Sequence, residues 1–179
     1  KDAYKLLIGK NIDYTLVLDR DYYPNEYLKE IKEKLKKFNI RVIFTLGKEI
    51  ENIFLFPKLL NALIPKQLHG KFLIVWNAMF KSRRLDCFGT YQTLHKKFLK
   101  PSLDTKTIIT RYTPKFEKCW NNLATRHQMI EGKEALKVLR NFYRENFGKN
   151  LSQDMLIEKL IETKRGDVRS FIESIFHYK

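Results

Sequence analysis

Cysteine and histidine are scarce in this 179-residue chain, and neither residue type is arranged for metal binding. Cys87 and Cys119 form no metal-ligand spacing and no disulfide framework, so we expect two reduced thiols, buried or half-buried, in a cytoplasmic protein. The histidines also fall at no metal-ligand spacing and are expected to be surface or satisfied core residues. They are His69, His95, His127 and His177.

Long apolar runs are absent as well. No stretch approaches the roughly 18 consecutive apolar residues of a membrane-spanning helix, and no signal peptide is visible, so no membrane partner is expected. The hydrophobic content of 44% excludes a disordered tail and suffices for one domain, or one domain with a small appendage. Residue 1 is Lys rather than Met, which favours a fragment of a longer protein.

Acidic residues are sparse in the middle of the chain, so the net charge of +15 is unevenly distributed. Residues 65–130 carry 13 Lys and Arg against 3 Asp and Glu, whereas residues 1–64 carry 12 against 9 and residues 131–179 carry 10 against 8. This clustering is typical of a polyanion binder and favours nucleic-acid contact, although a solvated basic face has the same pattern. The candidate phosphate contacts are Arg83, Arg84, Lys96, Lys97 and Lys100.

The apolar pattern predicts a fold of the α/β class, a small parallel βαβ core followed by a mainly helical C-terminal half. Residues 14–18 and 41–46 are the expected strands, and residues 25–38 are the helix between them. Further helices are expected at 58–64, 71–80, 91–99, 117–129 and 133–147, and behind the N-caps Ser152 and Asp167, with 105–112 a short strand or a loop. The predicted regions are an α/β core at 1–64, a basic helical insertion at 65–130 that contacts DNA, and a C-terminal helical segment at 131–179 that packs on the core.

Two carboxylates, Asp19 and Asp21, follow the first expected strand directly. Open α/β sheets bind ligands at the carboxyl ends of their strands, and hard divalent cations prefer oxygen ligands, so this pair predicts a site for Mg²⁺ or Mn²⁺. Capping of the following helix by a loop acid is the alternative. Glu49 and Glu51 follow the second strand at the same edge; we expect Glu51 to lie near the sheet and Glu49 to be solvated.

The order and spacing of three motifs resemble the TOPRIM region of OLD-family (overcoming lysogenization defect) ATP-dependent nucleases. The motifs are Leu18-Asp19-Arg20-Asp21, Glu49-Ile50-Glu51-Asn52 and Gly132-Lys133-Glu134. Residues 151–157 resemble the C-terminal helical segment of such proteins, so the resemblance spans nearly the whole chain, with 65–115 a poor guide.

The resemblance implies a TOPRIM-like fold and a divalent-metal-dependent endonuclease that acts on DNA, with an ABC-type ATPase domain upstream and a role in phage defence. Asp19 and Asp21 would then bind Mg²⁺ or Mn²⁺, and Glu51 would be a further ligand or a water-orienting group. Lys133 would be the catalytic cation, next to the scissile phosphate, where it stabilises the charge of the transition state.

The chain also departs from the family pattern. TOPRIM domains begin with a strand that ends in a catalytic Glu, and residues 1–10 contain no Glu. The chain has no Walker A sequence, so ATP hydrolysis is not predicted for these residues. One alternative is therefore a degenerate TOPRIM module that binds nucleic acid or mediates assembly, and self-association stays open. Another is a HAD-type phosphatase, which would use Gly166-Asp167, although Tyr22-Tyr23 stand where that family prefers Thr or Val.

Overall fold

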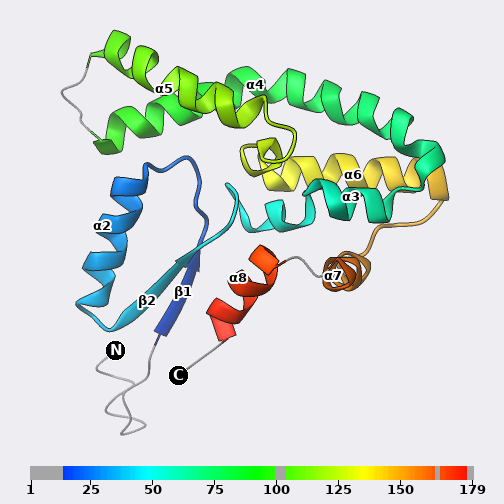
Figure 1. Cartoon of the computed structure of the whole chain (residues 1–179), viewed down its shortest axis with the longest axis horizontal. Helices are drawn as coiled ribbons and strands as arrows, with labels where there is room; N and C mark the ends of the chain where they lie inside the picture. Colours follow the sequence, from blue (N-terminus) through cyan, green and yellow to red (C-terminus); the bar gives the residue numbers. More distant parts are fainter. Residues whose placement is uncertain (1–13, 100–103, 164–165, 177–179) are drawn as a thin grey trace, which may run out of the picture.

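The N-terminal part of the computed structural model is a parallel βαβ unit. The structure describes residues 14–99, 104–163 and 166–176. β1 (Tyr14–Leu18) pairs in parallel with β2 (Ile40–Phe44), with Tyr14 opposite Ile40, and α2 (Asn25–Lys36) connects them. Among the described residues the sheet contains these two strands only. The predicted fold class, a small βαβ core followed by a mainly helical remainder, is confirmed (Figure 1).

The helix α2 ends earlier than its apolar pattern predicts. Its inward face buries Leu28, but the helix stops at Lys36, and Phe38 lies beyond it with 63% of its surface exposed. Asn39 adopts a left-handed conformation with φ of 53°, and its backbone N–H donates to the Lys36 carbonyl at 2.8 Å. Asn tolerates this conformation better than most residues, so the chain reverses here and enters β2.

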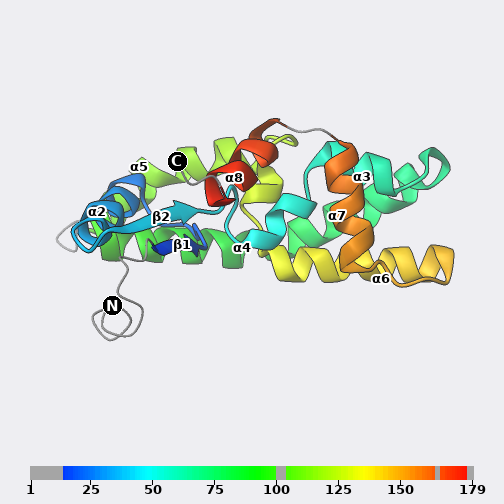
Figure 2. The same cartoon turned by 90° about the horizontal axis from the view of Figure 1, so that it is seen from below.

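The remainder of the described chain is helical. Its elements are η1 (Ile50–Phe54), α3 (Pro57–Leu63), η2 (Lys66–Leu68), α4 (His69–Leu99), α5 (Thr105–Trp120), η3 (Arg126–Gln128), α6 (Gly132–Phe147), α7 (Gln153–Glu162) and α8 (Gly166–Phe176). Figure 1 shows α4 and α5 side by side along one edge of the molecule, with α8 close to the strands. Figure 2, turned by 90°, shows α6 at another edge.

One sequence-based prediction in the middle of the chain is confirmed and another is wrong. Residues 71–80 and 91–99 are helical as predicted, and both belong to one 31-residue helix, α4. The residues between them contain no proline, so nothing interrupts the helix there. Residues 105–112 are neither strand nor loop but the first half of α5. The strand preference of the β-branched residues there is outweighed by two effects. The Asp104 side chain caps the helix by accepting from the Thr107 N–H at 2.9 Å, and one face of the helix is buried.

Helix boundaries in the C-terminal half are partly as predicted. α6 ends at Gly148, which has a φ of 62°, and the Ser152 side chain caps α7 by accepting from the Met155 N–H. The predicted helix at 117–129 is wrong, because α5 ends at Trp120 and a turn follows before η3. Asp167 is not an N-cap, since α8 already begins at Gly166.

The hydrophobic core lies among the helices rather than on the sheet. Fully buried side chains from α3, α5, α6 and α7 include Leu59, Phe116, Leu139 and Leu156, whereas Val17 in β1 is 39% exposed. An aromatic chain crosses the core. It contains Phe72, Trp76, Phe80, Trp120 and Phe116. None of the described helices combines the length and apolar character needed to cross a membrane.

Candidate functional site

The segment after β1 is held in place by hydrogen bonds from its backbone N–H groups to the segment after β2. The Arg20 N–H donates to Thr45 Oγ1 at 2.9 Å, and the Asp21 N–H donates to the Lys48 carbonyl at 2.8 Å. Asp21 itself has a left-handed φ of 47°. Because these bonds fix the backbone on both sides, the two aspartates are presented at the carboxyl end of the parallel strands, where the sequence predicts them.

The first and second motifs are in direct contact. Asp19 Oδ1 accepts a hydrogen bond of 3.0 Å from the Ile50 N–H, at the start of η1. The Glu49 N–H donates to Asn52 Oδ1 at 2.6 Å in a capping box. Asp19 therefore uses one carboxylate oxygen to hold the Glu49–Asn52 segment. The alternative, capping of the following helix, is wrong, because the N-cap of α2 is Pro24 and no side chain caps it.

Asn52 connects these motifs to the third one. Its side chain is 2% exposed, and its Nδ2 donates to the carbonyls of His127 at 2.6 Å and Ile130 at 3.0 Å. A Cβ on Gly132 would lie 3.0 Å from Glu51 Cβ and 3.1 Å from Asn52 N, so any larger residue would force this segment to shift by a few tenths of an ångström. Neither Asn52 nor Gly132 was predicted to have a role, and their positions within the second and third motifs were the only signal that could have identified them.

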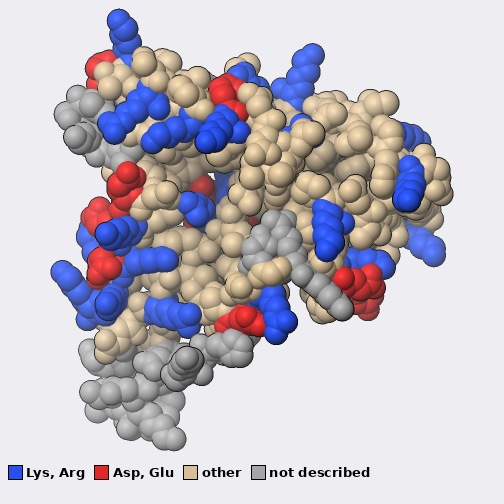
Figure 3. All heavy atoms as spheres, viewed as in Figure 1, with Lys and Arg blue, Asp and Glu red and all other residues tan. Residues whose placement is uncertain are grey.

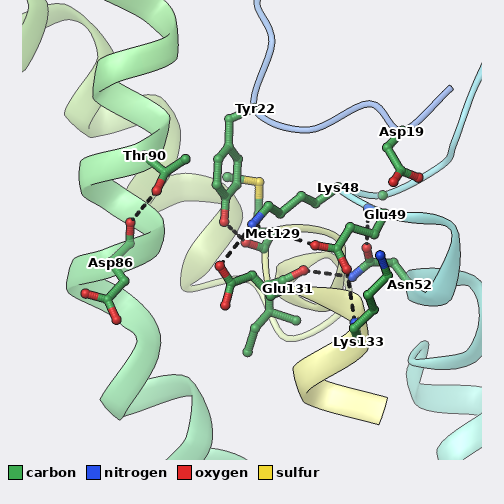
Figure 4. A network of polar contacts seen from close by, with 12 residues as sticks. Asp19, Tyr22, Lys48, Glu49, Asn52, Asp86, Thr90, Met129, Glu131 and Lys133 are labelled. Carbon is green, nitrogen blue, oxygen red and sulfur yellow. Dashed lines mark hydrogen bonds and ion pairs between the residues drawn. The ribbon is translucent and has the colours of Figure 1, made fainter. Parts of the chain in front are cut away.

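The third motif is completed by a hydrogen bond from Lys133. Its backbone N–H donates to Glu49 Oε2 at 3.0 Å in the first turn of α6, and its side chain is exposed. Glu49, expected to be solvated, is half-buried, and its carboxylate connects the second motif, to which it belongs, with the third. Figure 4 shows Asp19 and Lys133 on one side of the Glu49–Asn52 segment and Tyr22, Lys48 and Glu131 on the other.

On that second side, a buried lysine was missed by sequence reasoning. Lys48 is 7% exposed, and its Nζ lies 3.3 Å from Glu131 Oε1, 3.9 Å from Glu49 Oε1 and 5.0 Å from the ring centroid of Tyr22. The Tyr22 hydroxyl donates to the Met129 carbonyl. Burial raises the pKa of Tyr22 and also that of the neighbouring Cys87 thiol, so both groups are neutral near pH 7.

The carboxylates on the exposed side differ in their surroundings. Burial raises the pKa of Asp21, Lys48 opposes that shift, and the charge of Asp19 adds to it. Glu51 Oε2 is buried and has no hydrogen-bond partner among the described residues. Such an orphaned acceptor is costly unless a donor or a cation approaches it.

The donor set fits one kind of metal site. Within the described residues, no group of three or more His, Cys, Asp or Glu side chains is placed to hold a metal ion, so Asp19, Asp21 and Glu51 do not form such a group. Mg²⁺ is nevertheless commonly held by one or two carboxylates, with waters and substrate phosphates as the other ligands. Asp19 and Asp21 fit that arrangement, and Glu51 fits a water-orienting role better than a ligand role.

The predicted nucleic-acid contacts fall into two groups. Arg83 lies 3.4 Å from Glu134 and 4.0 Å from Asp86, and Arg84 pairs with Glu117. These two arginines are therefore already neutralised by carboxylates. Lys96 and Lys97 are exposed near the end of α4, and Lys100 lies outside the described residues. Figure 3 shows Lys and Arg side chains gathered over the α4–α5 pair on the face in view.

The two cysteines and two of the histidines, His69 and His95, have the surroundings that the sequence suggests. Both cysteines are free, with Cys87 buried and Cys119 half-buried. His95 is buried and its Nδ1 lies 2.9 Å from the Tyr91 carbonyl, while His69 Nε2 lies 2.6 Å from the Ile64 carbonyl. His177 lies outside the described residues.

Comparison of the chain with protein-family models, with curated proteins and with solved structures finds no match. The function is therefore argued from the site itself.

Proposed function

We propose that this chain carries a divalent-metal-dependent phosphodiester-hydrolysing site, that of a DNA nuclease, at the carboxyl end of β1. One observation carries the proposal: three motifs far apart in the sequence meet at this edge. Asp19 accepts from Ile50 in the second motif, and Glu49 of the second motif accepts from Lys133 in the third. The acids and the cation that phosphodiester hydrolysis requires thus lie on connected backbone segments.

Each residue has a role that follows from its surroundings. Asp19 and Asp21 would hold Mg²⁺ or Mn²⁺, which when bound supplies charge neutralisation at phosphate oxygens and lowers the pKa of water. Lys133 presents an exposed ammonium in the first turn of α6, while its backbone N–H is bonded to the Glu49 carboxylate. It stabilises the charge that develops on the phosphoryl oxygens in the transition state. Glu51 would orient the attacking water, which has to enter beside its buried Oε2, an oxygen that has no hydrogen-bond partner among the described residues.

The resemblance to OLD-family TOPRIM nucleases supports DNA as the substrate and extends the proposal to phage defence with an upstream ABC-type ATPase domain. The HAD-type alternative gains no support, because Gly166 and Asp167 open helix α8 instead of following a strand. The degenerate binding module is the second candidate function. It is favoured by one observation, the missing third carboxylate at the aspartate pair among the described residues.

Calorimetric titration of the full chain with Mg²⁺ and Mn²⁺ tests the site directly. We expect saturable binding that is lost in Asp19→Ala and retained in Asp154→Ala, a matched removal of an exposed acid on α7. The same variants are then assayed for cleavage of plasmid and single-stranded DNA with Mn²⁺ or with EDTA. Equal metal binding by the wild type and Asp19→Ala contradicts the proposed site. DNA binding without metal binding or cleavage favours the degenerate module.

A further inference from the structure

Helix α6 carries a second feature that extends outward from Lys133. An open groove beside this helix is lined by Lys133, Lys137, Arg140 and Arg144, together with residues of the segment that follows the helix. Successive residues of an α-helix are rotated by about 100°, so these positions fall within an arc of about 60°. The cations therefore form one continuous stripe, about 16 Å long at 1.5 Å per residue.

The stripe is not neutralised by carboxylates. Among the described residues, none of its cations has an ion-pair partner; Arg140 donates to Gln153 Oε1 at 3.1 Å and Arg144 to Asn141 Oδ1 at 3.3 Å. These amide oxygens hold the guanidinium groups without removing their charge. The acids of α6 lie off the stripe, and Glu134 contacts Arg83 instead. This differs from the α4–α5 region, where Arg83 and Arg84 are paired.

The position of the stripe is open to a large ligand. Figure 2 shows α6 along the edge of the molecule, with no other described element beyond it. Lys137, Arg140 and Arg144 are exposed, and the groove continues into Lys133 at the candidate site. Cations four residues apart lie about 6 Å apart along the axis, so they meet a chain of regularly spaced anions better than a single anion.

We propose that three cations of the α6 stripe, Lys137, Arg140 and Arg144, bind the phosphodiester backbone of a nucleic-acid strand and lead it to the fourth, Lys133. This inference rests on the proposed function in one respect, the course of the nucleic-acid strand, because the proposed cleavage site lies at the aspartate pair. The binding itself does not depend on cleavage. A regular row of unpaired cations suits a polyanion whose charges repeat along its length, and apolar side chains that would insert into a membrane are not part of the stripe.

The test compares two triple variants of the full chain with the same change in charge. Lys137→Gln/Arg140→Gln/Arg144→Gln removes these three cations of the stripe, and Lys96→Gln/Lys97→Gln/Lys106→Gln removes exposed cations from the α4–α5 region. Binding of fluorescent single-stranded DNA, duplex DNA and RNA is measured by anisotropy in EDTA over a salt series. Circular dichroism and thermal unfolding establish that both variants fold.

We expect the stripe variant to bind at least tenfold more weakly and to lower the salt slope of log K by about two to three, because each phosphate contact contributes about 0.7 to 0.9. The α4–α5 variant should change affinity by less than about threefold. Equal losses in both variants, or a larger loss in the α4–α5 variant, overturn the inference. So does binding of the wild type to anionic phosphatidylserine vesicles but to no nucleic acid.

The design separates this inference from the proposed function. Asp19→Ala should bind nucleic acid in EDTA as the wild type does, because the metal is absent in both. Loss of cleavage in Asp19→Ala with unchanged affinity in the stripe variant would overturn the stripe alone. Weaker binding by the stripe variant, with no cleavage by any form of the chain, would overturn the nuclease and leave the stripe.

Discussion

Lys48 and Lys133 lie on opposite sides of Glu49, one in the interior and one at the surface. Lys48 Nζ is buried beside Glu131 and Tyr22, whereas the Lys133 side chain is exposed and only its backbone N–H contacts Glu49. A buried ammonium with carboxylate partners is already satisfied and holds three segments together. An exposed ammonium without a carboxylate partner among the described residues remains available to a ligand. The comparison separates a structural lysine from a candidate catalytic one, although both lie next to the same glutamate.

The largest expected effect is on stability, from removal of the buried lysine. Lys48→Met leaves Glu49 and Glu131 without their cation, and breaking a buried ion pair costs about 3 kcal/mol, the lower end of the usual range because Glu131 is partly exposed. Urea unfolding followed by circular dichroism measures this free energy. Lys133→Met is the matched control and should change it by less than about 0.5 kcal/mol. Similar losses in the two variants would remove the distinction between the lysines.

The second effect is on turnover and concerns the exposed lysine. Lys133→Ala should lower kcat about a hundredfold or more, because a cation that stabilises transition-state charge is lost, while DNA affinity changes little. Single-turnover cleavage with Mn²⁺ separates the two quantities. Lys137→Ala is the control, with weaker binding and an unchanged rate at saturating DNA. An effect of Lys133→Ala on affinity alone would make this lysine a backbone contact.

The third effect concerns stability and tests the close contact between Gly132 and the Glu51–Asn52 backbone. Gly132→Ala should destabilise the fold by about 1–3 kcal/mol, because its Cβ would press against Glu51 and Asn52. Gly89→Ala in α4 meets no atom within 4 Å and should stabilise the protein by up to about 1 kcal/mol. We therefore expect thermal unfolding to show a lower midpoint temperature for Gly132→Ala and a higher one for Gly89→Ala. A stabilised Gly132→Ala variant would mean that the motifs are not in tight contact.

The smallest effect concerns pH. The pKa of Asp21 is raised above its ordinary 3.8 chiefly by burial, so the folded state holds this proton more tightly than the unfolded state. Stability is then lost as the pH rises from 3.8 through the raised pKa, and the cost of the buried charge persists at pH 7. Asp21→Asn, which suits a left-handed φ, should be about 0.5 kcal/mol more stable at pH 7.

The same variant sharpens the metal assignment. Added Mg²⁺ should stabilise the wild type by binding the folded state, and it should not stabilise Asp21→Asn. Urea titrations at pH 3.5 and pH 7, with and without Mg²⁺, measure both effects. A variant that is less stable than the wild type at pH 7, or equally stabilised by Mg²⁺, would show that the Asp21 carboxylate has a purely structural role.

Much of the fold was predictable because its signals are local. The apolar run before Asp19, the spacing around Leu28 and the glycine at position 148 each act within a few residues, and β1, α2 and α6 follow them closely. α5 was missed because β-branched residues favour strands in isolation. Its helix is stabilised by the Asp104 cap and by burial of Ile108 and Phe116, which depends on contact with α4.

The candidate site was predictable in part. Asp19 and Glu49 were identified as belonging to one edge of the sheet because they follow successive parallel strands. The role of Asn52 was not predictable, since its partners are carbonyls 75 and 78 residues away. The charge count pointed to residues 65–130 and away from α6. A charge count over a long segment does not distinguish the faces of a helix. The cations on one face of α6 are therefore offset in the count by acids on its other faces.

The sequence by itself determined the class of fold, the order of the motifs and the chemistry that their side chains offer, because propensity, periodicity and residue type are properties of short segments. Only the tertiary structure decided which charged side chains form ion pairs. Lys48 and Arg84 are paired with carboxylates from distant segments, while Lys133 and Arg140 have no carboxylate partner among the described residues. Pairing of charges is a matter of distances of a few ångströms between residues far apart in the chain, and only the packed structure sets those distances.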